Sequence, residues 1–426
     1  MADSRRGMLV AARAFARTRW LAWRLRARRD VERLHQRRIA RMMAGPIAQS
    51  PFYQRLGITD FSRLPIMDKA ALLADFPLLN RPGLTVDEVR AAIAAGRERI
   101  GGHVVGQSTG TSGNRGYYVI SDDERFVWLG TILAKTLPDA LWRRHRVALA
   151  MPGLSSLYRS ASSGSRISLA FFDLALGVDA WADRLAAFAP DTIVAPPKVL
   201  RRLAERGQLG ARHIFSGAEV LDPLDRAAIE SATEQHVREI YMATEGLFGV
   251  GCRHGTLHLA EDAVLFEWQS IDDSPLLSPL ITDFTRTAQV MARYRMNDLL
   301  ELAETPCPCG SPLQPVARIE GRQDDLFELI GADGAPRMVT PDVLRNAVVD
   351  ADPAIADFRI VQTGPAKVEI ALDPALGAGV DDRVAAAMAA LFARLGIGGI
   401  EIVVKRGLDL PFDRKLRRVR REWRPD

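Results

Sequence analysis

The chain has 426 residues, of which 47% are hydrophobic and 26% are charged, a balance typical of a globular protein rather than a disordered one. This length predicts two or three domains. The net charge is +5. Three cysteines in a chain of this length are too few for a disulfide-stapled fold, so we expect the protein to reside in a reducing cytoplasm. We expect neither a transmembrane span nor a signal peptide, because no apolar stretch has the required length or flanks.

Positive charge concentrates at the two ends of the chain, between residues 5 and 41 and between residues 405 and 421. Such clusters can bind the phosphates of nucleic acid or anionic lipid. No stacking platform or nucleic-acid motif accompanies them, so we expect no nucleic-acid partner.

Residues 8–44 are predicted to form one long helix with a single apolar stripe. The stripe consists of Trp20, Trp23, Ala27, Val31, Leu34 and Met42. We expect it to pack on the body of the protein. Weak association of this basic helix with a membrane surface is the alternative.

Residues 107–116 read QSTGTSGNRG, the most informative segment of the sequence. Glycines let backbone N–H groups close around an anion, and the hydroxyls add donors. A strand is predicted next, over residues 117–120. A Walker loop would carry a lysine and lead into a helix, so that class of phosphate loop is disfavoured. An ordinary surface turn is the other alternative.

Helical and strand patterns alternate along the rest of the chain, which predicts an α/β fold with a parallel sheet. The predicted strands cover residues 146–150, 192–195, 358–361, 368–372 and 400–404. The predicted helices cover residues 181–188, 197–206 and 380–395.

The cysteines predict a metal site. Cys252 is followed by His254 and His258, and Cys307 and Cys309 lie in a later knuckle-like turn. Three thiolates and one imidazole suit a closed tetrahedral zinc site, which leaves no open position for catalysis. Cysteines packed as small hydrophobes are the alternative. Either histidine could be the fourth ligand.

Six segments, in this order, resemble the motifs of the adenylate-forming superfamily of acyl-CoA synthetases, adenylation domains and luciferases. They are QSTGTSGNRG, SGAE at 216–219, YMATE at 241–245, YRMNDL at 294–299, GRQDD at 321–325 and LPFDRK at 410–415. FY at 52–53, LPIMDK at 64–69 and the cysteine segments are similar to the phenylacetate-CoA ligase branch, in which the position of His258 matches better than that of His254.

The resemblance implies a large N-terminal domain with parallel sheets and a small α+β C-terminal lid domain. We expect a basic helical segment over residues 1–50, an ATP- and acid-binding domain over 51–320 and a mobile C-terminal domain over 321–426.

It also implies an enzyme that uses ATP and Mg²⁺ to convert a carboxylic acid into acyl-AMP and pyrophosphate, with later transfer to a thiol or amine of CoA or a carrier protein. After the GRQDD hinge the chain reads LIGADGAPRMVTP, not the RGxNVFP typical of CoA ligases. Asp333-Gly334 predicts a tight turn between two strands there, so we expect free CoA to be a poor acceptor. The alternatives are a phenylacetate-CoA-ligase-like synthetase and a non-catalytic ATP-binding scaffold.

By the same resemblance, Glu245 would ligate magnesium and Lys415 would stabilise the forming acyl-phosphate. Tyr241 would stack on adenine, and Asp298 would bind the ribose hydroxyls. The expected nucleotide-binding residues are Ser108, Thr109, Gly110, Thr111, Ser112, Gly113, Gly217, Ala218, Glu219, Tyr241, Thr244, Asp298 and Arg322. The expected zinc ligands are Cys252, His258, Cys307 and Cys309.

Three positions depart from the family pattern. Asn114 and Arg115 replace the Pro-Lys of the phosphate loop, and Arg414 replaces the glycine before the catalytic lysine. The acid pocket is expected from residues 151–158 and 246–250, whose mixed apolar content favours an apolar or aromatic acid.

Overall fold

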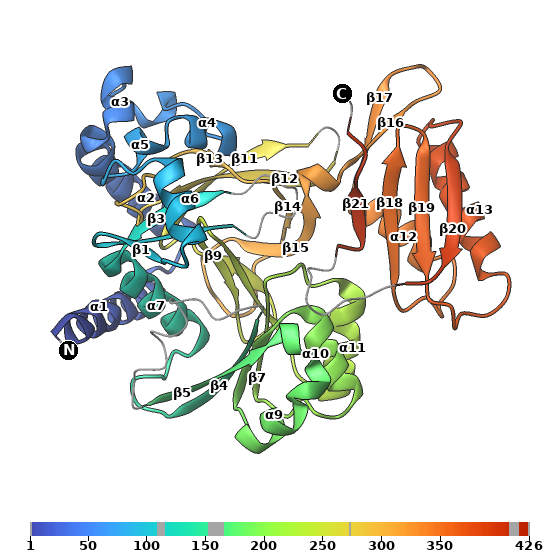
Figure 1. The fold of residues 1–426 in the computed structure, drawn as a ribbon, viewed down its shortest axis with the longest axis horizontal. Coiled ribbons are helices and arrows are strands. Elements are labelled where there is room, and N and C mark those ends of the chain that lie inside the picture. Colours follow the sequence, from blue (N-terminus) through green and yellow to red (C-terminus); the bar gives the residue numbers. More distant parts are fainter. Residues whose placement is uncertain (1, 109–115, 152–165, 272–273, 409–416, 425–426) are drawn as a thin grey trace.

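The computed structural model describes residues 2–108, 116–151, 166–271, 274–408 and 417–424, without the side chains of residues 2–4. These residues form a mixed α/β structure, which confirms the predicted fold class. Figure 1 shows a large body and, beside it, a smaller group of C-terminal elements in orange and red.

A twelve-stranded sheet runs through the large body, in the order β11-β12-β14-β15-β10-β9-β8-β7-β6-β4-β5, with β13 paired to β12. The parallel half comprises β4 (His145–Met151), β5 (Ile167–Asp173), β6 (Thr192–Ala195), β7 (His213–Gly217) and β8 (Arg238–Ala243). The antiparallel half comprises β9 (Gly246–Gly251), β10 (Leu257–Leu259), β11 (Val264–Ser270), β12 (Leu277–Asp283), β13 (Tyr294–Arg295), β14 (Asp298–Leu302) and β15 (Pro315–Arg322). The two halves meet where β8 pairs antiparallel with β9.

Helices connect the parallel strands, as alternating helix and strand patterns predict. They are η3 (Leu174–Leu176), η4 (Val178–Ala180), α9 (Ala182–Phe188), α10 (Pro197–Glu205) and α11 (Pro223–Thr233), and a further helix, α7 (Asp122–Thr136), precedes β4. Helix α7 begins at a capping box in which Ser121 and Glu124 satisfy each other's free backbone N–H groups. Apolar side chains of α9, α10 and α11 pack on β4, β6 and β7 and form the core of this half.

The N-terminal helix differs from the sequence prediction. It is divided into α1 (Ala2–Arg24) and α2 (Arg28–Met42), with a break over residues 25–27. The apolar stripe is also different, because Trp20 and Trp23 are 55% and 63% exposed. Helix α1 packs instead on α7 through Ala11, Phe15 and neighbouring small residues. The physical reason is that the close contact with α7 needs small side chains, which tryptophan cannot provide.

Short elements follow before the sheet begins. They are η1 (Met43–Ile47), α3 (Pro51–Leu56), η2 (Phe61–Arg63), α4 (Lys69–Ala74), α5 (Phe76–Leu79), α6 (Val86–Ala94), β1 (Arg99–Ile100), β2 (His103–Gln107) and β3 (Tyr117–Ser121). Strands β2 and β3 pair antiparallel and flank the predicted phosphate loop.

The C-terminal elements have their own core. They are η5 (Gln323–Asp325), β16 (Phe327–Ile330), β17 (Pro336–Val339), α12 (Pro341–Val349), β18 (Phe358–Gly364), β19 (Lys367–Leu372), α13 (Val380–Arg394), β20 (Glu401–Arg406) and β21 (Val419–Arg421). The sheet has the order β20-β19-β18-β21, and β16 and β17 form the hairpin expected around Asp333-Gly334. Strand β15 runs through the predicted boundary to Arg322, and the division at residues 320 and 321 stays a prediction.

Charged side chains join the C-terminal elements to the large body. Buried Arg418 donates to Asp225 of α11 at 2.7 Å and to Asp357 at 2.8 Å. Arg201 of α10 also contacts Asp225 at 3.1 Å, and its guanidinium donates to the carbonyl oxygen of Ala356. Arg418 therefore ties β21 to a helix that lies far from it in the sequence.

Among the described residues, no helix combines the length and apolarity that a membrane crossing requires.

Candidate nucleotide and metal sites

One cavity of about 860 Å³ collects residues from most of the sequence motifs. Its walls include the ends of β7 and β8, strands β14 and β15, and residues 417–419 beside β21. Of the residues expected from the sequence, it is lined by Ser108, Ala218, Glu219, Tyr241, Thr244, Glu245, Asp298 and Arg322. Gly217 lines a smaller neighbouring cavity instead.

Asp298 is held in place by residues on both sides. The Tyr241 hydroxyl donates a hydrogen bond to its Oδ2 at 2.7 Å, and Arg322 Nε lies 3.9 Å from its Oδ1. Burial and the nearby Asp298 carboxylate raise the pKa of Tyr241 far above its usual value, so this hydroxyl stays a donor. The Tyr241 ring packs on Phe248, with 5.3 Å between centroids. Its stacking on adenine stays a prediction, whereas its contact with Asp298 is a positioning role that sequence reasoning missed.

Glu245 lies in the turn between β8 and β9, where the sheet changes direction. Thr244 Oγ1 donates to its Oε2 at 2.8 Å, and the Tyr294 hydroxyl lies 3.4 Å from Oε1. These contacts orient a carboxylate toward the cavity. Carboxylate oxygens are ligands that Mg²⁺ prefers, so the geometry suits the expected role of Glu245.

The segment that follows β7 has an unusual backbone. Ala218 has a φ of 68°, a left-handed conformation that costs energy for a residue with a side chain. Glu219 lies 3.5 Å from Lys198 Nζ, and both side chains are buried. Ala218 is exposed toward the cavity, and its small side chain would let a flat ligand such as a purine ring approach the backbone closely.

The two ends of the predicted phosphate loop are joined. The backbone N–H of Ser108 donates to the Gly116 carbonyl at 2.7 Å, and the Gly116 N–H donates to Ser108 Oγ at 2.8 Å. Thr109, Gly110, Thr111, Ser112 and Gly113 lie outside the described residues, as do Lys415 and positions 152–158 of the expected acid pocket.

Lys69 also lines this cavity, although sequence reasoning gave it no role. A Cβ added to Gly116 would lie 3.4 Å from Lys69 Cε, so the lysine borders the end of the phosphate loop. Burial lowers the pKa of Lys69, and the carboxylate of Glu245 acts in the opposite direction. The motif LPIMDK, which ends at Lys69, could have indicated this role. An isolated β-bridge between Met67 and Tyr294 holds that segment beside the cavity.

A smaller cavity, of about 130 Å³, adjoins the first. It lies between α7 and the parallel strands, and its described lining residues carry no charge. Trp128, Met151, Ala218, Ile240 and Met242 line both cavities. Of the expected pocket residues, Met151 therefore borders both cavities, while Gly246 and Leu247 line the larger one.

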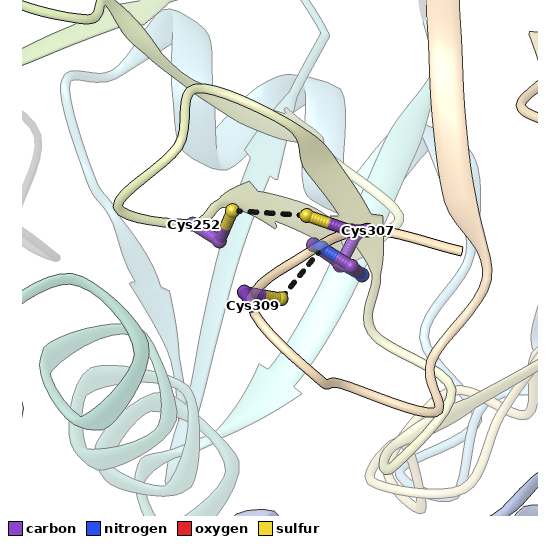
Figure 2. Close-up of side chains that lie close together, drawn as sticks. Cys252, Cys307 and Cys309 are labelled. Carbon is purple, nitrogen blue, oxygen red and sulfur yellow. Dashed lines mark hydrogen bonds between the residues drawn. The ribbon is translucent and has the colours of Figure 1, made fainter. Parts of the chain in front are cut away.

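The three cysteines converge with His258, as the sequence predicts. The four ligand atoms lie within 4.8 Å of one another, and Figure 2 shows the three cysteines facing a common point. Cys252 Sγ is 3.7 Å from Cys307 Sγ, and Cys309 Sγ is 3.3 Å from His258 Nε2. A tetrahedral zinc with Zn–S bonds of about 2.3 Å would hold two sulfurs at roughly 3.8 Å. The donor set and its spacing therefore fit that metal.

The second ring nitrogen of His258 fixes its orientation. His258 Nδ1 lies 3.0 Å from the Leu313 carbonyl oxygen, which can only accept, so Nδ1 is the donor of this hydrogen bond and Nε2 is the ring atom that faces the cysteines. His254 is exposed and contacts Arg253 at 3.1 Å, outside the group of four ligand atoms. The structure thus brings His258 into the cluster and not His254.

No family model matches the chain. It is 27% identical over 186 residues to Protein CapK of Staphylococcus aureus, and this match spans 40% of the chain and 41% of that protein.

Solved structures match over more of the chain. A 2-hydroxyisobutyryl-CoA ligase in its postadenylation state has a TM-score of 0.64 at 17% identity and covers 92% of this chain and 88% of that one. The same ligase in its thioesterification state has a TM-score of 0.50 at 18% identity, covering 92% and 89%. ATP-bound MatB from Rhodopseudomonas palustris has a TM-score of 0.51 at 16% identity, covering 71% and 63%. These likenesses show that the chain has the fold of the adenylate-forming acyl-CoA ligases.

Proposed function

We propose that this protein is an enzyme that uses ATP to adenylate a carboxylic acid. The observation that carries this proposal is the large cavity, where residues of five separate motifs meet in a chain with the fold of adenylate-forming ligases. An acid oxygen attacks the α-phosphorus, the bond to the β-phosphate breaks, and pyrophosphate leaves with the electron pair.

In this proposal, different residues of the cavity bind the ribose, the magnesium ion and the phosphates of ATP. Asp298, oriented by Tyr241 and Arg322, accepts hydrogen bonds from the ribose hydroxyls. Glu245 would hold Mg²⁺, which would neutralise charge on the phosphates. Lys69 adds a positive charge at the end of the phosphate loop, near Ser108. In related loops the lysine of the Pro-Lys pair supplies a positive charge near the phosphates. Asn114 and Arg115 replace that pair here, and the position of Lys69 supports the proposal that Lys69 supplies the charge instead. Lys415 is proposed, from the sequence alone, to stabilise the transition state.

The acid is proposed to have an apolar tail. The smaller cavity adjoins the nucleotide site, and its described lining offers no charged partner. An apolar cavity of about 150 Å³ is large enough for benzene, so a phenyl ring or a short hydrocarbon chain fits this size. A second carboxylate in the tail would lose its hydration without gaining a partner.

The acceptor of the acyl group is proposed to be a carrier-protein thiol or an amine rather than free CoA. At the position where the motif RGxNVFP is typical of CoA ligases, this chain reads LIGADGAPRMVTP, and β16 and β17 form a hairpin there. A phenylacetate-CoA-ligase-like synthetase remains the second candidate, because the 2-hydroxyisobutyryl-CoA ligase was solved with CoA.

The cysteine cluster is proposed to hold a structural zinc, bound by Cys252, His258, Cys307 and Cys309. The closed set of four ligands supports a structural role. Zinc bound by reduced thiolates also agrees with the cytoplasmic location expected from the sequence.

Pyrophosphate release tests this function. Purified protein with ATP and Mg²⁺ is given hexanoate, benzoate or phenylacetate and, for comparison, succinate or malonate. Release that depends on an apolar monoacid and exceeds that with the diacids supports the proposal. Release that no acid stimulates, with ATP still bound, would indicate the non-catalytic scaffold. Mass spectrometry with added CoA then decides between the two acceptor classes.

A further inference from the structure

Helix α1 carries two different faces. The inner face contains Gly7, Ala11, Phe15, Thr18 and Leu21, which are buried. Ala11 and Phe15 pack against α7, whereas Leu21 packs with Leu25 and Val31. A Cβ added to Gly7 would clash with Phe126, and one added to Gly130 of α7 would clash with the Ala11 carbonyl. The two helices therefore lie in close contact, and the inner face of α1 is already covered by the rest of the protein.

The outer face carries a second apolar stripe, at the three- and four-residue steps of one side of a helix. We call this the outer stripe, and it consists of Leu9, Ala12, Ala16, Trp20 and Trp23. Leu9, Trp20 and Trp23 are 61%, 55% and 63% exposed. Burying tryptophan is strongly favourable, so two exposed tryptophans on one stripe point to a surface that covers them.

Arginines flank the outer stripe. The exposed ones on α1 are Arg5, Arg6, Arg13, Arg17, Arg19 and Arg24. No acidic residue occurs between positions 5 and 24. One of the arginines, Arg6, pairs with Asp123 of α7. This face is therefore strongly positive along its length.

The turn after α7 extends this surface. Ala140 packs in the same cluster as Phe15, which places the turn alongside α1. Figure 1 shows α1 at the edge of the molecule beside α7. The next four residues, Leu141, Trp142, Arg143 and Arg144, are all exposed and repeat the combination of apolar and basic side chains. Two segments that are distant in the sequence, and that lie close together through Phe15 and Ala140, thus offer the same combination of side chains.

We propose that the outer stripe, its arginines and the 141–144 turn bind the surface of an anionic membrane, with α1 lying in the plane of the interface. Tryptophan rings would enter the headgroup region, and guanidinium groups would pair with lipid phosphates. Charge complementarity selects this partner, because the surface combines apolar side chains with more arginines than acids: among its basic residues, Arg6 pairs with Asp123 and Arg143 with Asp139, and α1 has no acidic residue between positions 5 and 24. The proposal goes beyond the adenylation function and does not depend on it.

Vesicle co-sedimentation of the full-length protein tests the proposal, with phosphatidylcholine vesicles that contain or lack phosphatidylglycerol. We expect binding to the anionic vesicles only, weakened by high salt. The triple change Arg13→Gln, Arg17→Gln, Arg24→Gln should lower the partition coefficient roughly 100-fold, at about fivefold per arginine near an anionic surface. The double change Trp20→Ser, Trp23→Ser should lower it at least tenfold.

Leu176→Ser is the matched control, because Leu176 is 68% exposed on η3, outside this surface. Its binding should equal that of the wild type, and all variants should keep the same thermal unfolding midpoint. Three outcomes would overturn the proposal. They are equal binding to neutral vesicles, unchanged binding of the tryptophan variant, and tighter binding to an oligonucleotide than to anionic vesicles. Loss of the two tryptophans that changes only self-association would also overturn it, since a second copy would then be the partner.

Discussion

The cysteine cluster and the large cavity both join segments that are distant in the sequence, but they hold their polar groups differently. In the cluster, four ligand atoms lie within 4.8 Å of one another and are directed at one point. In the cavity, Asp298 and Glu245 are each held by neighbouring hydroxyls and leave room for a ligand between the walls. The first arrangement is closed and suits stability, whereas the second is open and suits a reaction. Changes in the cluster should therefore affect folding, and changes in the cavity should affect turnover.

The largest effect is expected from the cluster. Cys307→Ser should remove zinc and lower the free energy of unfolding by about 5 kcal/mol or more, since structural zinc contributes roughly 10–16 kcal/mol in small peptides. Elemental analysis and denaturant unfolding measure both. His254→Ala is the control, because this exposed histidine lies outside the cluster and should change neither value. Equal zinc content in both variants would contradict the ligand assignment.

The second-largest effect is expected where charged side chains join the large body to the C-terminal elements. Arg418→Met would remove the cation that buried Asp225 and the nearby Asp357 share, and only Arg201 would still contact Asp225. Removing one partner of such a buried pair costs about 3–5 kcal/mol. Arg420→Met, two residues further on in β21, is the control, since Arg420 is more exposed and pairs with Glu422. Equal denaturant midpoints for the two variants would show that the Arg418 network contributes little to holding the parts together.

Substitutions in the cavity should lower the reaction rate and leave the stability of the protein unchanged. Glu245→Gln should lower acid-dependent pyrophosphate release about 100- to 1000-fold, the usual cost of removing one electrostatic contact to a transition state. Its unfolding midpoint should stay unchanged, because Glu245 is only half-buried. Glu304→Gln, at an exposed loop position, is the control. Full activity of the Glu245 variant would remove this residue from the site.

The smallest effect concerns the ribose contact. Asp298→Asn should raise the KM for ATP by an amount equivalent to about 1.5–3 kcal/mol, because it weakens hydrogen bonds to a charged group. Tyr241→Phe keeps the ring and loses the hydrogen bond to Asp298, so it should cost about 0.5–1.5 kcal/mol. Steady-state kinetics at varied ATP measures both. A larger effect from Tyr241→Phe than from Asp298→Asn would reverse the order of importance proposed here.

Short motifs made much of the cavity predictable. Residues of YMATE and YRMNDL line the one cavity, as the motifs predict, whereas the 2.7 Å hydrogen bond between Tyr241 and Asp298 was not predicted. The cluster was predictable for a similar reason, since few residue types bind zinc. The side of α1 that packs was not predictable, because the helix has two apolar stripes and the close contact at Gly7 and Gly130 decides between them. The pairing of Arg418 with Asp225 was missed because nothing local to either residue indicates it.

Transfer of ¹⁸O from the acid to AMP tests the central claim most directly. The protein is given ATP, Mg²⁺ and a carboxylic acid labelled in both oxygens, with hydroxylamine to trap the acyl group. Attack of the acid on the α-phosphorus predicts AMP that carries one ¹⁸O after hydroxylamine takes the acyl group at its carbonyl carbon. Mass spectrometry should find this label with the wild type, and the Glu245→Gln variant should form about 100- to 1000-fold less labelled AMP in the same time. Unlabelled AMP, or ADP with labelled phosphate, would contradict the account.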